Sequence, residues 1–258
     1  MAKRSARRRA IQAEHYAGDD QAHPKVTKLF PIDGGYRPEA SDREPRDDRE
    51  QRYVKNVQPR SEGQKQLMQA IDAFNLVMAL GPAGTGKTYL AIAKAVEALE
   101  AGRVGRIVLS RPAVEAGESI GFLPGAMEDK LAPYLRPLYD ALHDRLPPKR
   151  LRSLMAEGLI EIAPVGYMRG RTLNNAFVVI DEAQNCTYTQ LKMLLTRLGW
   201  HSTMVVTGDP NQTDLLPELS GLSTCAEKLD ALDTIGVVRL AKEDIVRHPL
   251  VADMLQVL

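Results

Sequence analysis

The stretch LVMALGPAGTGKTYL (Leu76–Leu90) constrains the fold of this chain more than any other. An apolar run typical of a buried strand meets a turn made almost wholly of small residues, and a helix-forming segment follows at once. Glycines in such a turn let backbone N–H groups close around an anion without a Cβ in the way. The stretch therefore predicts a strand–loop–helix unit that binds phosphate groups.

The loop itself fits the pattern G-x-x-x-x-G-K-[ST] in full. The residues predicted to bind the nucleotide, ATP, are Gly81, Pro82, Ala83, Gly84, Thr85, Gly86, Lys87, Thr88 and Tyr89. Lys87 is expected along the β- and γ-phosphates, and the Thr88 hydroxyl is expected to hold Mg²⁺. The alternative is a glycine-rich strand–helix turn with an incidental lysine.

Two later strands also end in polar residues. AFVVIDEAQN places Asp181 and Glu182 just past an apolar strand, at the carboxyl edge where parallel sheets bind ligands. We expect Asp181 to complete the Mg²⁺ shell and Glu182 to take a proton from water. TMVVTGDPNQTD ends another strand, and Gln212 is predicted to sense the γ-phosphate. The alternatives are a solvated helix N-terminus for the acids and a type I turn around Pro210.

The pattern of the remaining chain predicts the fold class. Apolar strands are predicted at 76–80, 106–110, 159–163, 176–180, 203–207 and 237–240, with helices at 61–74, 87–102, 187–197, 222–232 and 243–257. Wholly apolar strands that alternate with helices predict an α/β fold, a mostly parallel sheet with helices on both faces. With the phosphate loop after the first strand, the expected type is a P-loop NTPase (RecA-like) fold. The amphipathic segment 124–146 is expected to kink or split at Pro133 and Pro137.

Charge is distributed unevenly along the chain. Residues 1–60 hold 14 Lys/Arg against 10 Asp/Glu, whereas the remainder holds 20 against 23. Residues 1–58 show no sustained apolar period, so we predict a mostly disordered charged arm before a domain at 59–258. The basic residues of the arm either keep the chain soluble or contact phosphates. Because the domain is not a polycation, any nucleic-acid binding must use a local patch.

The composition also indicates where in the cell the protein is expected. No apolar run approaches the roughly 20 residues of a membrane helix, and no apolar segment follows the basic start MAKRSARRRA, so no membrane partner or secretory signal is expected. The two cysteines, Cys186 and Cys225, lack metal-type spacing. These features predict a cytoplasmic protein without a disulfide scaffold.

Six motifs occur in a characteristic order: GPAGTGKT, SRPAVEAGESIGFLPG, GYMRGRT, VVIDEAQN, TGDPNQTD and EDIVRHPLV. Together they resemble the PhoH-like proteins, bacterial phosphate-starvation-associated ATPases, from about Tyr53 to the C-terminus. That family in turn is similar to the first motor domain of superfamily 1 helicases. The resemblance implies an ATPase that couples hydrolysis to binding or remodelling RNA or single-stranded nucleic acid. It also implies a ring-like homo-oligomer, suspected to be a hexamer.

The resemblance further implies roles for single residues. Gln64 matches the glutamine that reads adenine in such helicases, although a capping box with Ser61 competes for it. Arg247 corresponds to the arginine near the end of the family domain. We expect no second motor domain, so the arginine that acts on the γ-phosphate would come from within the domain or from a neighbouring copy, with Arg247 a candidate for reaching the neighbour's γ-phosphate. Predicted nucleic-acid contacts are Arg169 and Arg171, with Arg111 at the rim of the site; the alternative for each arginine is a solvated surface position.

Two other functions compete with this reading. A nucleotide-gated switch or scaffold would hydrolyse ATP slowly and act on a protein partner. A small-molecule kinase is disfavoured because DEAQ places a water-activating acid and no lid-like arginine-rich segment follows the phosphate loop. Aromatic residues make up only 5% of the chain, so contacts to the nucleic-acid backbone should dominate over base stacking.

Overall fold

The computed structural model describes residues 57–112 and 127–246. Its strands are β1 (Leu76–Leu80), β2 (Arg106–Arg111), β3 (Ile160–Pro164), β4 (Ala176–Ile180), β5 (Thr203–Gly208) and β6 (Gly236–Arg239). Its α-helices are α2 (Glu62–Ala73), α3 (Lys87–Glu100), α4 (Met127–His143), α5 (Pro148–Ala156), α6 (Tyr188–Leu195) and α7 (Leu222–Asp230). Short 3₁₀ turns are η2 (Val165–Met168), η3 (Ala183–Asn185), η4 (Pro217–Leu219) and η5 (Lys242–Asp244).

The six strands form one sheet in the order β3-β2-β4-β5-β1-β6. Every pairing in this sheet is parallel, as the apolar strand pattern predicted. The carboxyl ends of all six strands therefore lie at one edge. The glycine-rich loop after β1, the acid pair after β4 and the polar segment after β5 meet at that edge, because β4, β5 and β1 are neighbours.

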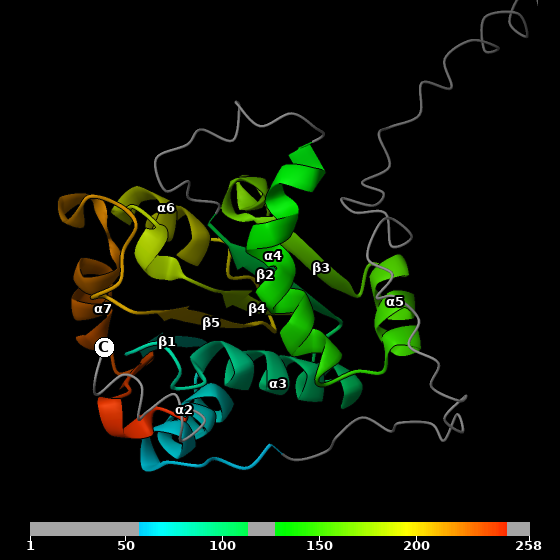
Figure 1. Ribbon diagram of the computed structural model, residues 1–258, viewed down its shortest axis with the longest axis horizontal. Helices are drawn as coiled ribbons and strands as arrows, with labels where there is room; N and C mark the ends of the chain where they lie inside the picture. The colour runs from blue at the N-terminus through cyan, green and yellow to red at the C-terminus, as the bar shows by residue number, and fades with distance from the viewer. Residues whose placement is uncertain (1–56, 113–126, 247–258) are drawn as a thin grey trace, which may run out of the picture. The chain divides into compact units, whose positions relative to one another are not determined.

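Helices cover both faces of the sheet (Figure 1). On one face, α3 packs on β2, β4 and β5, while α4 packs on β2 and β3. On the opposite face, α6 and α7 pack against each other and over the even-numbered positions of β1, β2, β4 and β5. This layering confirms the predicted class, an α/β fold with helices on both faces of a parallel sheet.

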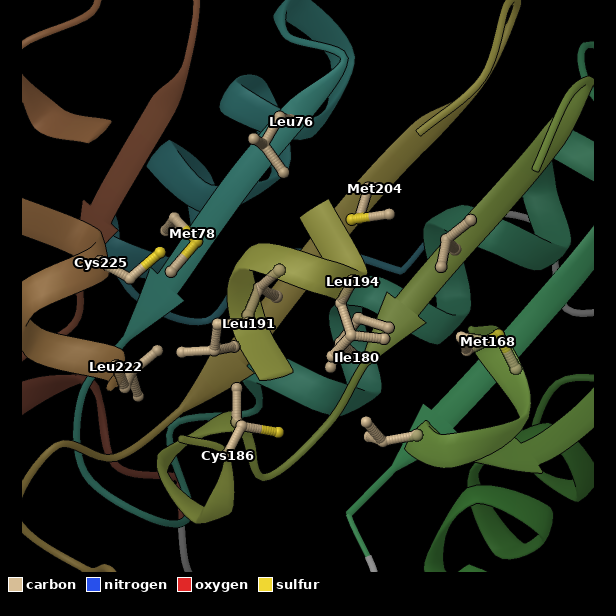
Figure 2. Close-up of a cluster of buried hydrophobic side chains, with 14 of the residues drawn as sticks. Leu76, Met78, Met168, Ile180, Cys186, Leu191, Leu194, Met204, Leu222 and Cys225 are labelled. Atoms are coloured by element: carbon tan, nitrogen blue, oxygen red, sulfur yellow. The ribbon is translucent and has the colours of Figure 1, made fainter. Parts of the chain in front are cut away.

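Figure 2 shows the core on the α6–α7 face. Met78, Ile180 and Met204 project from three strands toward Leu191 of α6 and Leu222 of α7, and all five are fully buried. Cys186 and Cys225 lie in the same cluster and are free. Burial raises the pKa of the Cys186 thiol to about 12. Both cysteines therefore act as small apolar side chains in this core.

Some predicted boundaries differ from the structure. The helix α4 runs without a break through Pro133 and Pro137, so the chain does not split there. Three leucines on its buried face, at 135, 138 and 142, hold it against the sheet. Of the helix predicted at 243–257, the described part is only the turn η5 and two further residues. The predicted arm, except residues 57 and 58, lies outside the described residues.

Candidate active site

The loop after β1 turns sharply because glycine allows it. Gly81 has φ +142°, and a Cβ there would lie 2.4 Å from the carbonyl oxygen of Leu240. Gly84 and Gly86 also have positive φ values, which favour glycine. The loop leads directly into α3, which begins at Lys87, so its amides and the positive end of the helix face the same space. This is the geometry of an anion-binding loop.

Lys87 closes over that loop. Its ammonium donates hydrogen bonds to the carbonyl oxygens of Gly81 (2.6 Å) and Pro82 (2.8 Å). Burial lowers the pKa of Lys87, and the charges of Asp209, Glu182 and Asp181 oppose that change. The ammonium therefore sits among three carboxylates with little access to water, where a phosphate group would be a strong additional partner.

Asp181 joins the loop to the neighbouring strands. One of its carboxylate oxygens accepts hydrogen bonds from the hydroxyls of Thr88 (2.5 Å) and Thr207 (2.8 Å), and the side chain is almost fully buried. Carboxylate and hydroxyl oxygens suit Mg²⁺. In the part of the chain that the structure describes, no group of three or more His, Cys, Asp or Glu residues could hold a metal. A Mg²⁺ ion at Asp181 and Thr88 would thus need phosphate and water oxygens, as Mg²⁺ sites commonly do.

Glu182 is held on both sides of its carboxylate. Its backbone is left-handed, with φ +51°, which is uncommon for a non-glycine residue. The Gln184 amide donates to one carboxylate oxygen, while the Arg111 guanidinium lies 3.5 Å from the other. Arg111 also lies 3.5 Å from Asp181. The residue predicted at the rim of the site is thus in contact with both acids.

The segment after β5 is tied to the acid pair by two residues that the sequence prediction missed. The side chain of Gln184 accepts a hydrogen bond from the backbone N–H of Asp209 (3.1 Å). The side chain of Asn185 both accepts from the backbone N–H of Asp214 and donates to its carboxylate, each at 2.8 Å. No local pattern predicts these pairs, since they join residues 25 and 29 positions apart. The two motifs therefore form one connected unit.

A cavity of about 250 Å³ lies between these segments. Its lining comprises Ala83, Gly84, Gly86, Lys87, Thr88, Tyr89, Asp181, Glu182, Gly208, Asp209 and Gln212. Nine of these were predicted as site residues from the sequence; Gly208 and Asp209 were not assigned a role. Gly81, Pro82 and Thr85 are also in the loop but do not line the cavity. The arrangement can hold an anion, a Mg²⁺ ion and a water molecule next to a carboxylate.

Gln64 supports the loop from behind. Half of the predicted capping box forms, because the Ser61 hydroxyl accepts from the Gln64 backbone N–H (3.2 Å). The Gln64 side chain does not complete the box; it donates to the Thr85 carbonyl oxygen (2.9 Å) and accepts from the Arg60 backbone N–H (2.8 Å). Its predicted contact with adenine stays a prediction, and Arg247 lies outside the described residues.

The two arginines of YMRGRT differ in their surroundings. Arg171 forms a bidentate ion pair with Glu161 (2.6 and 2.7 Å), which raises its pKa and occupies its guanidinium. Arg169 is exposed, and we find no ion pair between it and any residue that the structure describes. Tyr167 beside it is 52% exposed, whereas Met168 between them is buried and anchors the turn. Of the two, only Arg169 is available to a phosphate.

The fold and the site together define a P-loop NTPase, in which a glycine-rich loop, its lysine and a strand-end carboxylate share one cavity on a parallel sheet. The chain matches the family described as PhoH-like protein over residues 56–258. It belongs to that family, as its motifs indicated.

Similar proteins span most of the domain. The chain is 54% identical over 204 residues to a PhoH-like protein of Mycobacterium tuberculosis, covering 79% of this chain and 58% of the relative. It is 53% identical over 203 residues to one of Bacillus subtilis (78% and 64%) and 45% identical over 205 residues to Protein PhoH of Escherichia coli (78% and 58%). The chain thus matches about three fifths of the length of these curated relatives.

Solved structures with a similar arrangement are more distant. One is the large terminase of a thermophilic bacteriophage, with a TM-score of 0.46 and 13% identity over 77% of this chain and 50% of that one. Another is Bacteroides Pif1 bound to ssDNA, with a TM-score of 0.35 and 18% identity over 78% of this chain and 46% of that one.

In the described ranges no helix is both long and apolar enough to cross a lipid bilayer.

Proposed function

We propose that this chain is an ATPase that couples ATP hydrolysis to binding or remodelling RNA or single-stranded nucleic acid. The observation that carries the hydrolytic part is the cluster at Asp181, where hydroxyls from the phosphate loop and from β5 converge on one buried carboxylate beside Lys87. A cavity built this way binds a triphosphate at its phosphate end.

In this mechanism the loop amides and Lys87 bind the β- and γ-phosphates, and Lys87 exchanges its loop carbonyl contacts for phosphate oxygens. Thr88 and Asp181 would hold Mg²⁺, which supplies positive charge to the phosphates when bound. Glu182 orients an attacking water and accepts its proton. Gln212, on the cavity wall, contacts the γ-phosphate and responds to its loss.

The nucleic-acid part of the proposal is supported by residues at the same edge of the sheet. Arg169 and Tyr167 are exposed on the turn after β3, and Arg111 ends β2. Since β2 lies between β3 and β4, a strand of nucleic acid contacting these residues would pass next to the acid pair. An exposed arginine that pairs with no acid among the described residues suits a phosphodiester backbone, and an exposed aromatic ring suits a base.

ATP turnover measured with and without single-stranded RNA tests both parts. Lys87→Ala is expected to abolish nucleotide binding or turnover. Glu182→Gln should retain bound ATP but hydrolyse it about 100-fold more slowly or worse, the size of a general-base contribution. Wild-type turnover in the Glu182 variant would remove that residue from the mechanism. A rate that no RNA or DNA changes, at low and at moderate salt, would favour the nucleotide-gated switch instead.

A further inference from the structure

Arg111 lies between the acid pair proposed for hydrolysis and the exposed turn proposed to contact nucleic acid. Its guanidinium spans the acid pair, 3.5 Å from Asp181 Oδ2 and 3.5 Å from Glu182 Oε1. Its side chain is 21% exposed, so solvent reaches part of it. Arg111 ends β2, the strand between β4 with the acids and β3 with the exposed Tyr167–Arg169 turn.

The pairing restrains the proposed general base. Of the two carboxylate oxygens of Glu182, Arg111 engages one and Gln184 the other. Donors on both oxygens stabilise the charged form of the carboxylate, so they make Glu182 a weaker base toward the attacking water than it would be with one of them removed. The Arg111 contact is the weaker of the two by distance, and it is the one that solvent reaches.

We propose that Arg111 is a positioning residue that couples nucleic-acid binding to hydrolysis, because a backbone phosphate and Glu182 compete for its guanidinium. Without nucleic acid, Arg111 holds Glu182 in the paired arrangement. When a phosphate binds Arg111, Glu182 is released to accept the proton of the attacking water. This inference rests on the proposed function and gives a reason for nucleic acid to stimulate turnover.

Competition for one guanidinium makes a reciprocal prediction that needs neither nucleotide nor metal. Glu182→Gln removes one of the two acids that hold the guanidinium and leaves the contact with Asp181, so Arg111 is held less tightly and RNA binding should tighten. Breaking it from the other side removes the phosphate contact, so Arg111→Gln should weaken RNA binding. For a partly exposed ion pair, each change should be about threefold to tenfold.

The experiment is fluorescence anisotropy of a labelled single-stranded RNA, and of the matching DNA, in EDTA without nucleotide and at two salt concentrations. The expected order of affinity is Glu182→Gln, then wild type, then Arg111→Gln, with the double variant equal to Arg111→Gln. If Glu182→Gln acted only by removing a negative charge, it would also tighten RNA binding in the Arg111→Gln background. A double variant that binds RNA more tightly than Arg111→Gln would therefore overturn the proposal. Asp230→Asn is the matched control, because it breaks an exposed pair with Arg239 on β6, at the other end of the sheet.

Turnover gives a second, independent readout. With Arg111→Gln, the ATPase rate without RNA should rise about threefold to tenfold at unchanged KM, and RNA should no longer stimulate it. A variant that binds nucleotide but hydrolyses it far more slowly would instead make Arg111 a catalytic arginine and overturn the coupling role. An Arg111→Gln protein with wild-type stimulation would do the same. If the wild type binds neither RNA nor DNA, the proposed function falls and the inference falls with it.

Discussion

The hydroxyl of Thr88 donates a hydrogen bond of 2.5 Å to the carboxylate of Asp181, a residue 93 positions further along the chain. Thr88 is the second residue of α3 and Asp181 follows β4, so this one bond joins the phosphate loop to the acid pair. β5 lies between β4 and β1, the strand before the phosphate loop, and it contributes Thr207, whose hydroxyl donates to the same oxygen of Asp181. The orientation of Asp181 is thus set by two hydroxyls.

Thr207→Val tests the contribution of the second hydroxyl. Thr207 is fully buried, and valine keeps its shape while removing the hydrogen bond that fixes Asp181. Groups that orient a metal ligand typically contribute about 10- to 100-fold in metal affinity. The Mg²⁺ concentration for half-maximal ATPase activity should therefore rise by about that factor, with little change in the rate at saturating Mg²⁺. Thr196→Val, on the surface of the chain, is the control; an unchanged Mg²⁺ dependence in Thr207→Val would contradict the assignment.

The strands and the phosphate loop could be predicted from the sequence because each has a local signature. Leu76–Leu80 and Ala176–Ile180 are unbroken apolar runs, and the structure has strands with the same bounds. The glycine spacing of the loop likewise encodes its turn locally, as the positive φ of Gly84 and Gly86 indicates. Such features depend only on neighbours in the sequence, so no knowledge of the strand order was needed.

The contacts of the site could not be predicted in the same way. That Arg111 would meet Glu182, and that Gln184 would bond Asp209, depends on β2, β4 and β5 being adjacent. Strand order is a property of the whole sheet, and no motif in this chain specifies it. Arg171 is a similar case, because the motif alone does not show that Glu161, in β3, pairs with its guanidinium.

Asn185 is expected to stabilise the segment after β5. Its side chain makes two hydrogen bonds to Asp214, and Thr213 donates to the Asn185 side chain (3.4 Å) and to the Gln184 carbonyl oxygen (3.0 Å). Asn185→Ala should lower the free energy of unfolding by about 1–3 kcal/mol, the range for losing two or three hydrogen bonds at a partly buried site. Urea titration measures this change. Asn211→Ala, in which an exposed side chain on the same segment is truncated, should cost far less, and equal costs would argue against the role of Asn185.

The pairing of Lys94 with Asp72 and Glu97 should respond asymmetrically to mutation. The Lys94 ammonium lies 2.7 Å from Asp72 and 3.4 Å from Glu97, with the lysine side chain 8% exposed and both acids nearly half exposed. Lys94→Met leaves two acids that water can solvate, so the free energy of unfolding should change by less than about 1 kcal/mol. Asp72→Asn leaves a buried ammonium with only the longer contact and should cost about 1–3 kcal/mol. Chemical denaturation of both variants checks this order, and a costlier Lys94→Met would reverse the interpretation.

Asp244 links the chain end of the described domain to the start of α2 and should make stability depend on pH. Its carboxylate accepts hydrogen bonds from the backbone N–H groups of Gly63 (3.1 Å) and Ala241 (2.8 Å). The pKa of Asp244 lies below its ordinary value of 3.8. A hydrogen bond from Ser61 and the two backbone hydrogen bonds lower it, and burial partly opposes them. Two residues later, the Val246 N–H donates to the Gly84 carbonyl oxygen (3.0 Å), so this turn also supports the phosphate loop.

The sign of the pH effect follows from the lowered pKa. A carboxyl whose folded pKa is below its unfolded pKa contributes stability at pH values above the unfolded pKa, and this contribution is lost as pH falls through the folded pKa. Asp244→Asn should therefore lower the free energy of unfolding near neutral pH by about 1.5–3 kcal/mol, the range for hydrogen bonds to a charged group. Urea titrations between about pH 7 and about pH 3 should show the difference from wild type shrinking toward the acid end. Asp233→Asn, at an exposed position, controls for loss of charge alone. A constant difference across the range would mean that the charge of Asp244 is not what stabilises the turn.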